Sequence, residues 1–283
     1  MTGLHVLNLG AGVQSTTLYL LSMEGRIPRF DAAIFADTQD ETAATYQHLE
    51  WLKSLNGAPI LVRTRGCLSE DLMRGKNSTG QRFASIPAFT AERDSARAGM
   101  VRRQCTKEYK IEVIEKTIRR ELFGLKPGQR LPKDAVVHQY IGISWDERTR
   151  AADIEHRRFK DRRAWRVHFP LLTMNGEMQP GWTRQYCETV YLPSRVPHRV
   201  PRSACRECPF HSDDEWAELK ANPAEWSKII QIDTAMREPG RIVNRNLDQK
   251  LYLHRACRPI DQIDFTNENQ MGFALECEGG CGL

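Results

Sequence analysis

A short stretch near the start of the chain combines the residue types that bind phosphate. Residues 7–17 are an apolar run, a glycine turn and then hydroxyl side chains. Glycines let the backbone turn tightly and approach an anion, and Ser or Thr can cap a following helix whose N-terminus carries partial positive charge. The stretch predicts a phosphate-binding loop, with a ligand-free strand–helix turn as the alternative; its residues are Gly10, Ala11, Gly12, Val13, Gln14, Ser15 and Thr16.

The cysteines are the second chemical feature. The chain contains eight, and Cys205 and Cys208 have the Cys-x-x-Cys spacing that is typical of thiolate ligation or redox chemistry. In a reducing cytosol such a set indicates metal or redox chemistry rather than disulfides. Four sulfur ligands suit an iron–sulfur cluster or zinc. Cys187 precedes the pair on an adjoining predicted helix and could be a further ligand, or it could be a small buried apolar residue.

Alternating strands and helices would position these groups. Apolar runs predict strands at 4–9, 32–36, 59–62, 135–143 and 166–172. Helical spacing of apolar residues predicts helices at 15–23, 41–55 and 107–122. This alternation is typical of βαβ units. We therefore expect an α/β fold with a Rossmann-like parallel five-stranded sheet flanked by helices.

Polar clusters follow three of these predicted strands. The loop at 10–16, Asp37 and the segment from Gly142 to Arg148 would all lie at the carboxyl edge of the sheet, where open α/β folds bind ligands. Asp37 could contact a ribose hydroxyl, an adenine amine or a metal, or could cap the next helix. Arg148 could hold a phosphate with two hydrogen bonds, or belong to a solvated charged face.

The chain changes character near residue 176. Residues 1–175 are predicted to form the α/β domain that carries the phosphate-binding loop, and residues 176–283 an α-rich segment that carries the Cys-x-x-Cys pair and a mobile tail. Helices are expected at 182–192 and 213–236. The long connection at 63–105, rich in glycine and basic residues, is typical of a lid, a binding loop or an insertion.

Composition limits the function classes. The chain has 283 residues and a formal net charge of +5, which suits anionic ligands and leaves nucleic acid open. No apolar run approaches the ~20 residues of a membrane span, and the N-terminus lacks the pattern of a secretory leader. We expect a cytoplasmic protein without a membrane partner.

Five segments taken together resemble the phosphoadenosine phosphosulfate reductase family, within the adenine nucleotide α-hydrolase (PP-loop) superfamily. They cover most of residues 1–210 and lie at 10–15, 35–42, 103–107, 142–148 and 205–210. Two departures matter. Gln14 stands where the pyrophosphatase branch has an aspartate, and Cys105-Thr106 stands where some reductases have paired cysteines.

The resemblance implies an enzyme that binds an adenine nucleotide or sulfonucleotide and handles sulfur. It implies catalytic roles for Asp37, Arg148 and Cys281, the last being a tail thiol that attacks the sulfur of the bound sulfonucleotide. Alternatively, Cys277 and Cys281 are incidental thiols of a frayed terminus, or the tail supplies a cluster ligand.

The resemblance also implies a 4Fe–4S cluster, with zinc as the alternative, and it favours Cys105 as a ligand beside Cys205 and Cys208. Cys187 is the further ligand favoured by its position, and Cys277 and Cys281 are the other candidates. Magnesium is a further candidate cofactor, and a thioredoxin-like protein is a candidate electron donor.

Two other functions remain open. A sulfur transferase of the same superfamily would adenylate a nucleobase of tRNA or DNA and then insert sulfur, and the basic net charge favours it. A non-catalytic nucleotide-binding or zinc-bound nucleic-acid module is the third, because Gln14 and the altered loop depart from the catalytic pattern.

Overall fold

The computed structural model describes residues 3–75, 86–91, 98–101, 103–157, 164–176, 179–237 and 250–265. Its centre is a parallel sheet with the strand order β3-β2-β1-β6-β7. The strands are β1 (Leu4–Leu9), β2 (Ala32–Asp37), β3 (Ile60–Thr64), β6 (Val137–Tyr140) and β7 (Trp165–His168). The predicted α/β fold with a five-stranded parallel sheet is confirmed.

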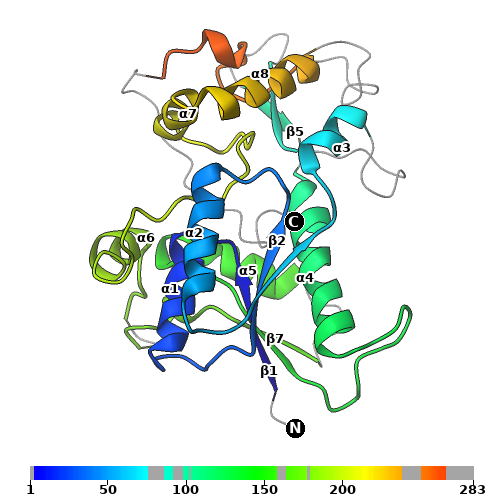
Figure 1. Cartoon of the computed structure of the whole chain (residues 1–283), viewed down its shortest axis with the longest axis vertical. Helices are drawn as coiled ribbons and strands as arrows, with labels where there is room; N and C mark the ends of the chain where they lie inside the picture. The colour runs from blue at the N-terminus through cyan, green and yellow to red at the C-terminus, as the bar shows by residue number, and fades with distance from the viewer. Residues whose placement is uncertain are drawn as a thin grey trace.

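Alternating side chains in the strands bury both faces of this sheet. Leu7 and Leu9 of β1 pack in the cluster that contains α1 (Val13–Met23) and α2 (Ala43–Ser54). Val6 packs in the opposite cluster with a long helix, whose successive parts are η1 (Thr106–Ile111), α4 (Glu112–Thr117) and η2 (Ile118–Leu122). Figure 1 shows α1 and α2 on one side of the sheet and α4 on the other.

The order of the strands creates a switch point next to β1. The chain adds β2 and β3 on one side of β1, then returns to place β6 and β7 on the other side. A short turn η3 (Trp145–Glu147) and the helix α5 (Arg148–Arg157) follow β6. In open α/β sheets the carboxyl ends of the strands at such a point border the ligand crevice.

The described parts of the long connection after β3 include regular structure. It contains α3 (Leu68–Arg74), β4 (Ala88–Ala91) and β5 (Ala98–Val101), and β4 also pairs with β8 (Leu251–Tyr252). A lid, a binding loop or an insertion was predicted here, and this helix and these strands were not anticipated. The short strands lack the apolar alternation that would mark them in the sequence.

Two helices replace the one predicted at 213–236. They are α7 (Asp213–Lys220) and α8 (Pro223–Arg237), and they belong to the upper part of the molecule in Figure 1 together with α3 and β5. Pro223 lacks an N–H group and is favoured at the first position of a helix, so it ends one helix and begins the next. These elements share a second apolar cluster that includes Trp216 and Ile229.

Two short turns, η4 (Pro170–Leu172) and η5 (Cys187–Tyr191), pack in the apolar cluster that contains α1 and α2. The helix α6 (Arg184–Tyr186) leads directly into η5. Trp182 and Cys187 lie in the same apolar cluster as α1. Hydrophobic packing thus continues across the division expected at residue 175.

None of the helices in the described part of the chain has both the length and the apolar character that crossing a membrane requires.

Candidate functional site

The loop after β1, residues 10–16, leads into the first turn of α1. All seven residues are buried, and Ala11 has φ = 56°, a left-handed conformation that residues other than glycine rarely adopt. The hydroxyl of Ser15 accepts hydrogen bonds from the N–H groups of Gly10 at 3.2 Å and Gly12 at 3.3 Å. One hydroxyl thus satisfies two backbone donors beside a helix N-terminus, and a phosphate oxygen can accept from the same groups.

Gln14 connects this loop to the segment that follows β6. Its Nε2 group donates to Glu147 Oε2 at 2.8 Å and to Ser144 Oγ at 3.3 Å, and all three side chains are buried. Burial raises the pKa of Glu147, and the paired Arg150 guanidinium opposes that shift. Gln14 Oε1 is buried and has no hydrogen-bond partner among the described residues. The two segments beside the switch point meet through this glutamine, which keeps one acceptor atom unused.

Asp37 lies at the end of β2, half-buried. Its Oδ1 atom accepts hydrogen bonds from the Tyr46 hydroxyl at 2.8 Å and from the Gln39 N–H at 2.7 Å. Burial, followed by the bond to Asp37, raises the pKa of Tyr46. Thr42, not Asp37, caps α2, because its side chain accepts from the N–H of Thr45. Both hydrogen bonds of Asp37 are made by Oδ1, so Oδ2 has no partner among the described residues.

Arg148 is exposed at the start of α5, and Gly142 is buried just beyond β6. The Arg148 guanidinium lies 5.2 Å from the centre of the Trp145 ring and donates to the Trp145 carbonyl at 3.3 Å. Stacking on an indole restricts the guanidinium without consuming its other donors. Cys281 lies outside the described residues.

β1 lies between β2 and β6, so the three predicted segments are neighbours at one edge of the sheet. We call residues 10–16, Asp37 and residues 142–150 the rim.

A buried amide pair beneath the rim was not anticipated. Gln139 Nε2 donates to Asn8 Oδ1 at 2.7 Å, across the neighbouring strands β1 and β6. Both side chains are buried, and Asn8 Nδ2 and Gln139 Oε1 have no partner among the described residues. A polar residue inside a buried apolar strand, two or three positions before a glycine, is the sequence feature that could have identified them.

Charged groups join the end of β2 to the cysteine-bearing segment. Lys110 Nζ lies 2.9 Å from Glu41 Oε1, and both side chains are buried. Arg206 Nη2 donates to Asp40 Oδ1 at 2.7 Å. We call Asp40, Glu41, Lys110 and Arg206 the clasp. Buried ion pairs are costly to break, so the clasp fixes residues 205–206 against the sheet.

Two cysteine thiols lie next to the clasp. Cys205 Sγ lies 3.2 Å from Thr38 Oγ1, and Cys67 Sγ lies 3.5 Å from Asp40 Oδ2. Burial is the main cause that raises the pKa of Cys67. Burial also raises the pKa of Glu207, which lies between the paired cysteines, well above its ordinary range. Both Cys67 and Glu207 are therefore held toward their neutral forms.

The four predicted sulfur ligands do not all lie in the same apolar cluster. Cys187 is fully buried in the apolar cluster with α1. Cys205 and Cys105 belong to the other cluster, with α7 and α8. The N–H of Cys208 donates to the Cys205 carbonyl at 2.9 Å, which closes a tight turn.

A search of the described residues finds no group of three or more His, Cys, Asp or Glu side chains that could hold a metal ion. The four predicted ligand cysteines are therefore not gathered into such a group among the described residues. A cluster and zinc both stay predictions from the resemblance. Cys277 and Cys281 lie outside the described residues.

A basic cavity of about 620 Å³ lies beside the edge strand β3 and the helix α4. Its charged lining residues are Arg63, Arg65, Glu112, Lys116, Arg120 and Glu121. Both glutamates pair with arginines, whereas Lys116 and Arg120 have no acidic partner within the described chain. Thr64 of β3, also in the lining, lies opposite Asp37 in the sheet. The cavity therefore borders the carboxyl edge that carries the rim.

Comparisons of the chain with protein-family models, with curated proteins and with solved structures find no match.

Proposed function

We propose that the chain is a phosphoadenosine phosphosulfate reductase-like enzyme that binds an adenine nucleotide at the rim. One observation carries the proposal. The loop after β1 and the segment after β6 flank the switch point, and Gln14 joins them through Glu147 and Ser144. Ligand crevices in open α/β sheets lie at this position.

The rim offers separate groups for separate parts of a nucleotide. The N–H groups now bonded to Ser15 and the N-terminus of α1 suit a phosphate or phosphosulfate. Gln14 Oε1 and Asp37 Oδ2 are acceptors without partners among the described residues, and they suit amine or hydroxyl donors of the adenosine. Arg148 supplies a cation at the open side.

The sulfur step uses a thiol that the rim itself lacks. The Cys281 thiolate attacks the sulfur of the bound sulfonucleotide, forming an S–S bond while the sulfur–oxygen bond to the nucleotide phosphate breaks. The nucleotide leaves with the oxygen and its electron pair. A second thiol, from a thioredoxin-like donor, then releases sulfite and forms a disulfide with Cys281.

Sulfite release tests this reaction. The wild type, given adenosine phosphosulfate or phosphoadenosine phosphosulfate with reduced thioredoxin, should release sulfite, and Cys281→Ser should abolish it. Cys257→Ser is the matched control and should retain activity. Equal activity of wild type and Cys281→Ser would refute the thiol step, and no sulfite from either substrate would refute the reductase function.

The basic cavity favours a second candidate function. Lys116 and Arg120 lie next to the edge of the sheet that carries Asp37, where the phosphate backbone of a nucleic acid could bind. A sulfur transferase that activates a nucleobase of tRNA or DNA with ATP would use such a surface. AMP or pyrophosphate formed from ATP only when tRNA or DNA is present would support it, whereas the same products without nucleic acid would not.

A further inference from the structure

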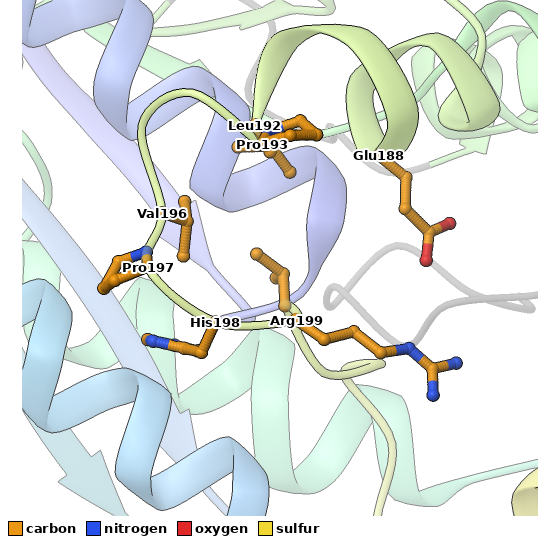
Figure 2. A pocket seen from close by; sticks show the side chains of 8 residues that line it. Glu188, Leu192, Pro193, Val196, Pro197, His198 and Arg199 are labelled. Atoms are coloured by element: carbon orange, nitrogen blue, oxygen red, sulfur yellow. The ribbon is translucent and has the colours of Figure 1, made fainter.

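A pocket of about 350 Å³ lies along residues 188–200, part of which belongs to the same apolar cluster as α1 and α2. Figure 2 shows His198 at one side of this pocket, with its ring turned toward α2. Glu188 and Arg199 extend from the opposite side. His198 is exposed to solvent.

Two hydrogen bonds link the His198 imidazole to the phosphate-binding loop. His198 Nε2 lies 2.8 Å from His48 Nδ1, and His48 Nε2 lies 2.8 Å from Thr16 Oγ1. Thr16 and His48 are fully buried. The chain of contacts, which we call the histidine relay, runs from the pocket through α2 to the first turn of α1.

The middle residue of the relay stays neutral. Burial, and then the neighbouring His198, lowers the pKa of His48 to about 3. A neutral imidazole has one N–H donor and one acceptor nitrogen. Its two hydrogen bonds must therefore point in the same direction along the relay: if His48 accepts at Nδ1 it donates at Nε2, and the reverse also holds.

Protonation of His198 selects one of these directions. A protonated imidazole donates from both nitrogens, so His48 Nδ1 must accept and His48 Nε2 must donate to Thr16 Oγ1. The Thr16 hydroxyl then keeps its own hydrogen for another acceptor. With neutral His198, the opposite direction is allowed, and Thr16 then donates its hydrogen to His48.

Four described residues near His198 are titratable, charged or aromatic. On α2 they are His48 and Trp51, whose ring centre lies 5.4 Å away in an edge-on contact. On its own segment and η5 they are Arg199 and Glu188, which line the same pocket. Figure 2 shows the charged ends of both directed away from the His198 ring.

We propose that His48 and His198 are positioning residues that turn the Thr16 hydroxyl into a donor for a bound anion when His198 is protonated. The inference rests on the proposed nucleotide site, and it adds a control of that site from a second pocket. An anion at the loop gains one hydrogen bond in the protonated state, so affinity increases as the pH falls through the range in which histidine titrates.

Calorimetric titration with adenosine 5′-phosphosulfate tests this, without reductant, between pH 8 and pH 5.5. This probe has no group that titrates near neutral pH, so its own charge stays constant. The wild type should bind roughly tenfold more tightly at pH 5.5 than at pH 8, the equivalent of one hydrogen bond. His198→Phe keeps a ring beside Trp51 but removes both nitrogens, and it should flatten the profile. Arg199→Gln, which removes a charge from the same pocket, should leave the profile intact.

The outcomes separate the two proposals. Binding with the same pH profile in wild type and His198→Phe overturns the relay and leaves the nucleotide site standing. No binding by the wild type at any pH overturns both. Nitrogen NMR of the imidazoles adds a readout that needs no ligand: His48 should hold its proton on Nε2 at pH 5.5 and shift part of it to Nδ1 by pH 8. A fixed tautomer across this range contradicts the relay.

Discussion

The rim and the clasp are neighbouring buried polar regions built from different chemistry. The rim is held mainly by neutral groups: the Ser15 hydroxyl bonds within the loop and the Gln14 amide joins the two sides, whereas the ion pair of Glu147 with Arg150 lies within a single segment. The clasp is held by charges, with Lys110 on Glu41 and Arg206 on Asp40. Both regions begin within a few residues of the carboxyl end of a strand in the same sheet.

The difference indicates which region exchanges partners. Replacing a neutral hydrogen bond by one to a ligand changes the free energy little, because one contact substitutes for another. Separating a buried ion pair leaves charges without compensation and is strongly unfavourable. We therefore interpret the rim as the binding surface, and the clasp as the support that keeps residues 205–206 and the long helix in place.

Lys110→Met should have the largest effect. It removes the ammonium group from the buried Glu41 and should lower the free energy of unfolding by about 3–5 kcal/mol, measured by urea titration. Lys107→Met, at an exposed position one turn earlier, is the matched control and should change it little. The double variant Lys110→Met/Glu41→Leu should recover much of the loss. A loss below about 1 kcal/mol for Lys110→Met would remove the distinction between clasp and rim.

Acid should weaken the fold through His48. Its pKa in the folded chain is lowered to about 3, so below pH 6.5 the unfolded chain binds more protons than the folded one. The stabilisation is complete above about pH 6.5 and is lost as the pH falls toward 3. Between pH 6.5 and 5 this one group should cost about 2 kcal/mol.

Urea titrations at several pH values measure this loss. His48→Gln keeps a hydrogen-bonding side chain that does not titrate, so its stability should fall less steeply than that of the wild type. Parallel pH profiles for the two proteins would show that His48 is not neutral in the folded state.

Gln14→Leu should have a moderate effect on stability and a clear effect on binding. Glu147 and Ser144 lose a donor, which should cost about 1–2 kcal/mol in urea unfolding. Nucleotide affinity should fall, because the two sides of the switch point lose their link. Gln47→Leu, exposed on α2, should change neither quantity. A loss as large as that of Lys110→Met would mean that the rim is as rigidly fixed as the clasp.

Arg63→Gln should have the smallest effect on stability. Arg63 makes two contacts to Glu121, at 2.7 and 2.9 Å through Nε, but both side chains are 39% exposed. Exposed pairs contribute roughly 0.2–1 kcal/mol, and salt screens them. Urea unfolding at low and high salt should show a small difference that shrinks with salt. A loss as large as that of Lys110→Met would show that burial is not what separates the clasp from surface pairs.

The sequence predicts the sheet and the rim because their determinants are local. Apolar runs that end in glycine or aspartate mark the strands and the residues after them, so Gly10 and Asp37 could be placed before any contact was known. The strand predicted at 166–172 ends instead at His168, since Pro170 begins a short helical turn. The hairpin of β4 and β5 was missed because four-residue strands have too few positions for a pattern.

The clasp and the histidine relay could not be predicted in this way. Lys110 is 69 residues from Glu41, and His198 is 150 residues from His48. Their pairing depends on which helix covers which face of the sheet, and the spacing of residues within a helix does not contain that information. The same reason applies to Cys187, whose position in an apolar cluster follows from the docking of η5 on α1.

Photoaffinity labelling with an azido-adenine nucleotide, followed by peptide mapping, tests the central claim most directly. The label should fall in peptides containing residues 10–16 or 142–150, and excess unlabelled adenine nucleotide should suppress it. Gln14→Leu should reduce the labelling, and Gln47→Leu should not. Label that is not suppressed by the competitor, or that is confined to peptides containing residues 63–65 or 188–200, would contradict a nucleotide site at the rim.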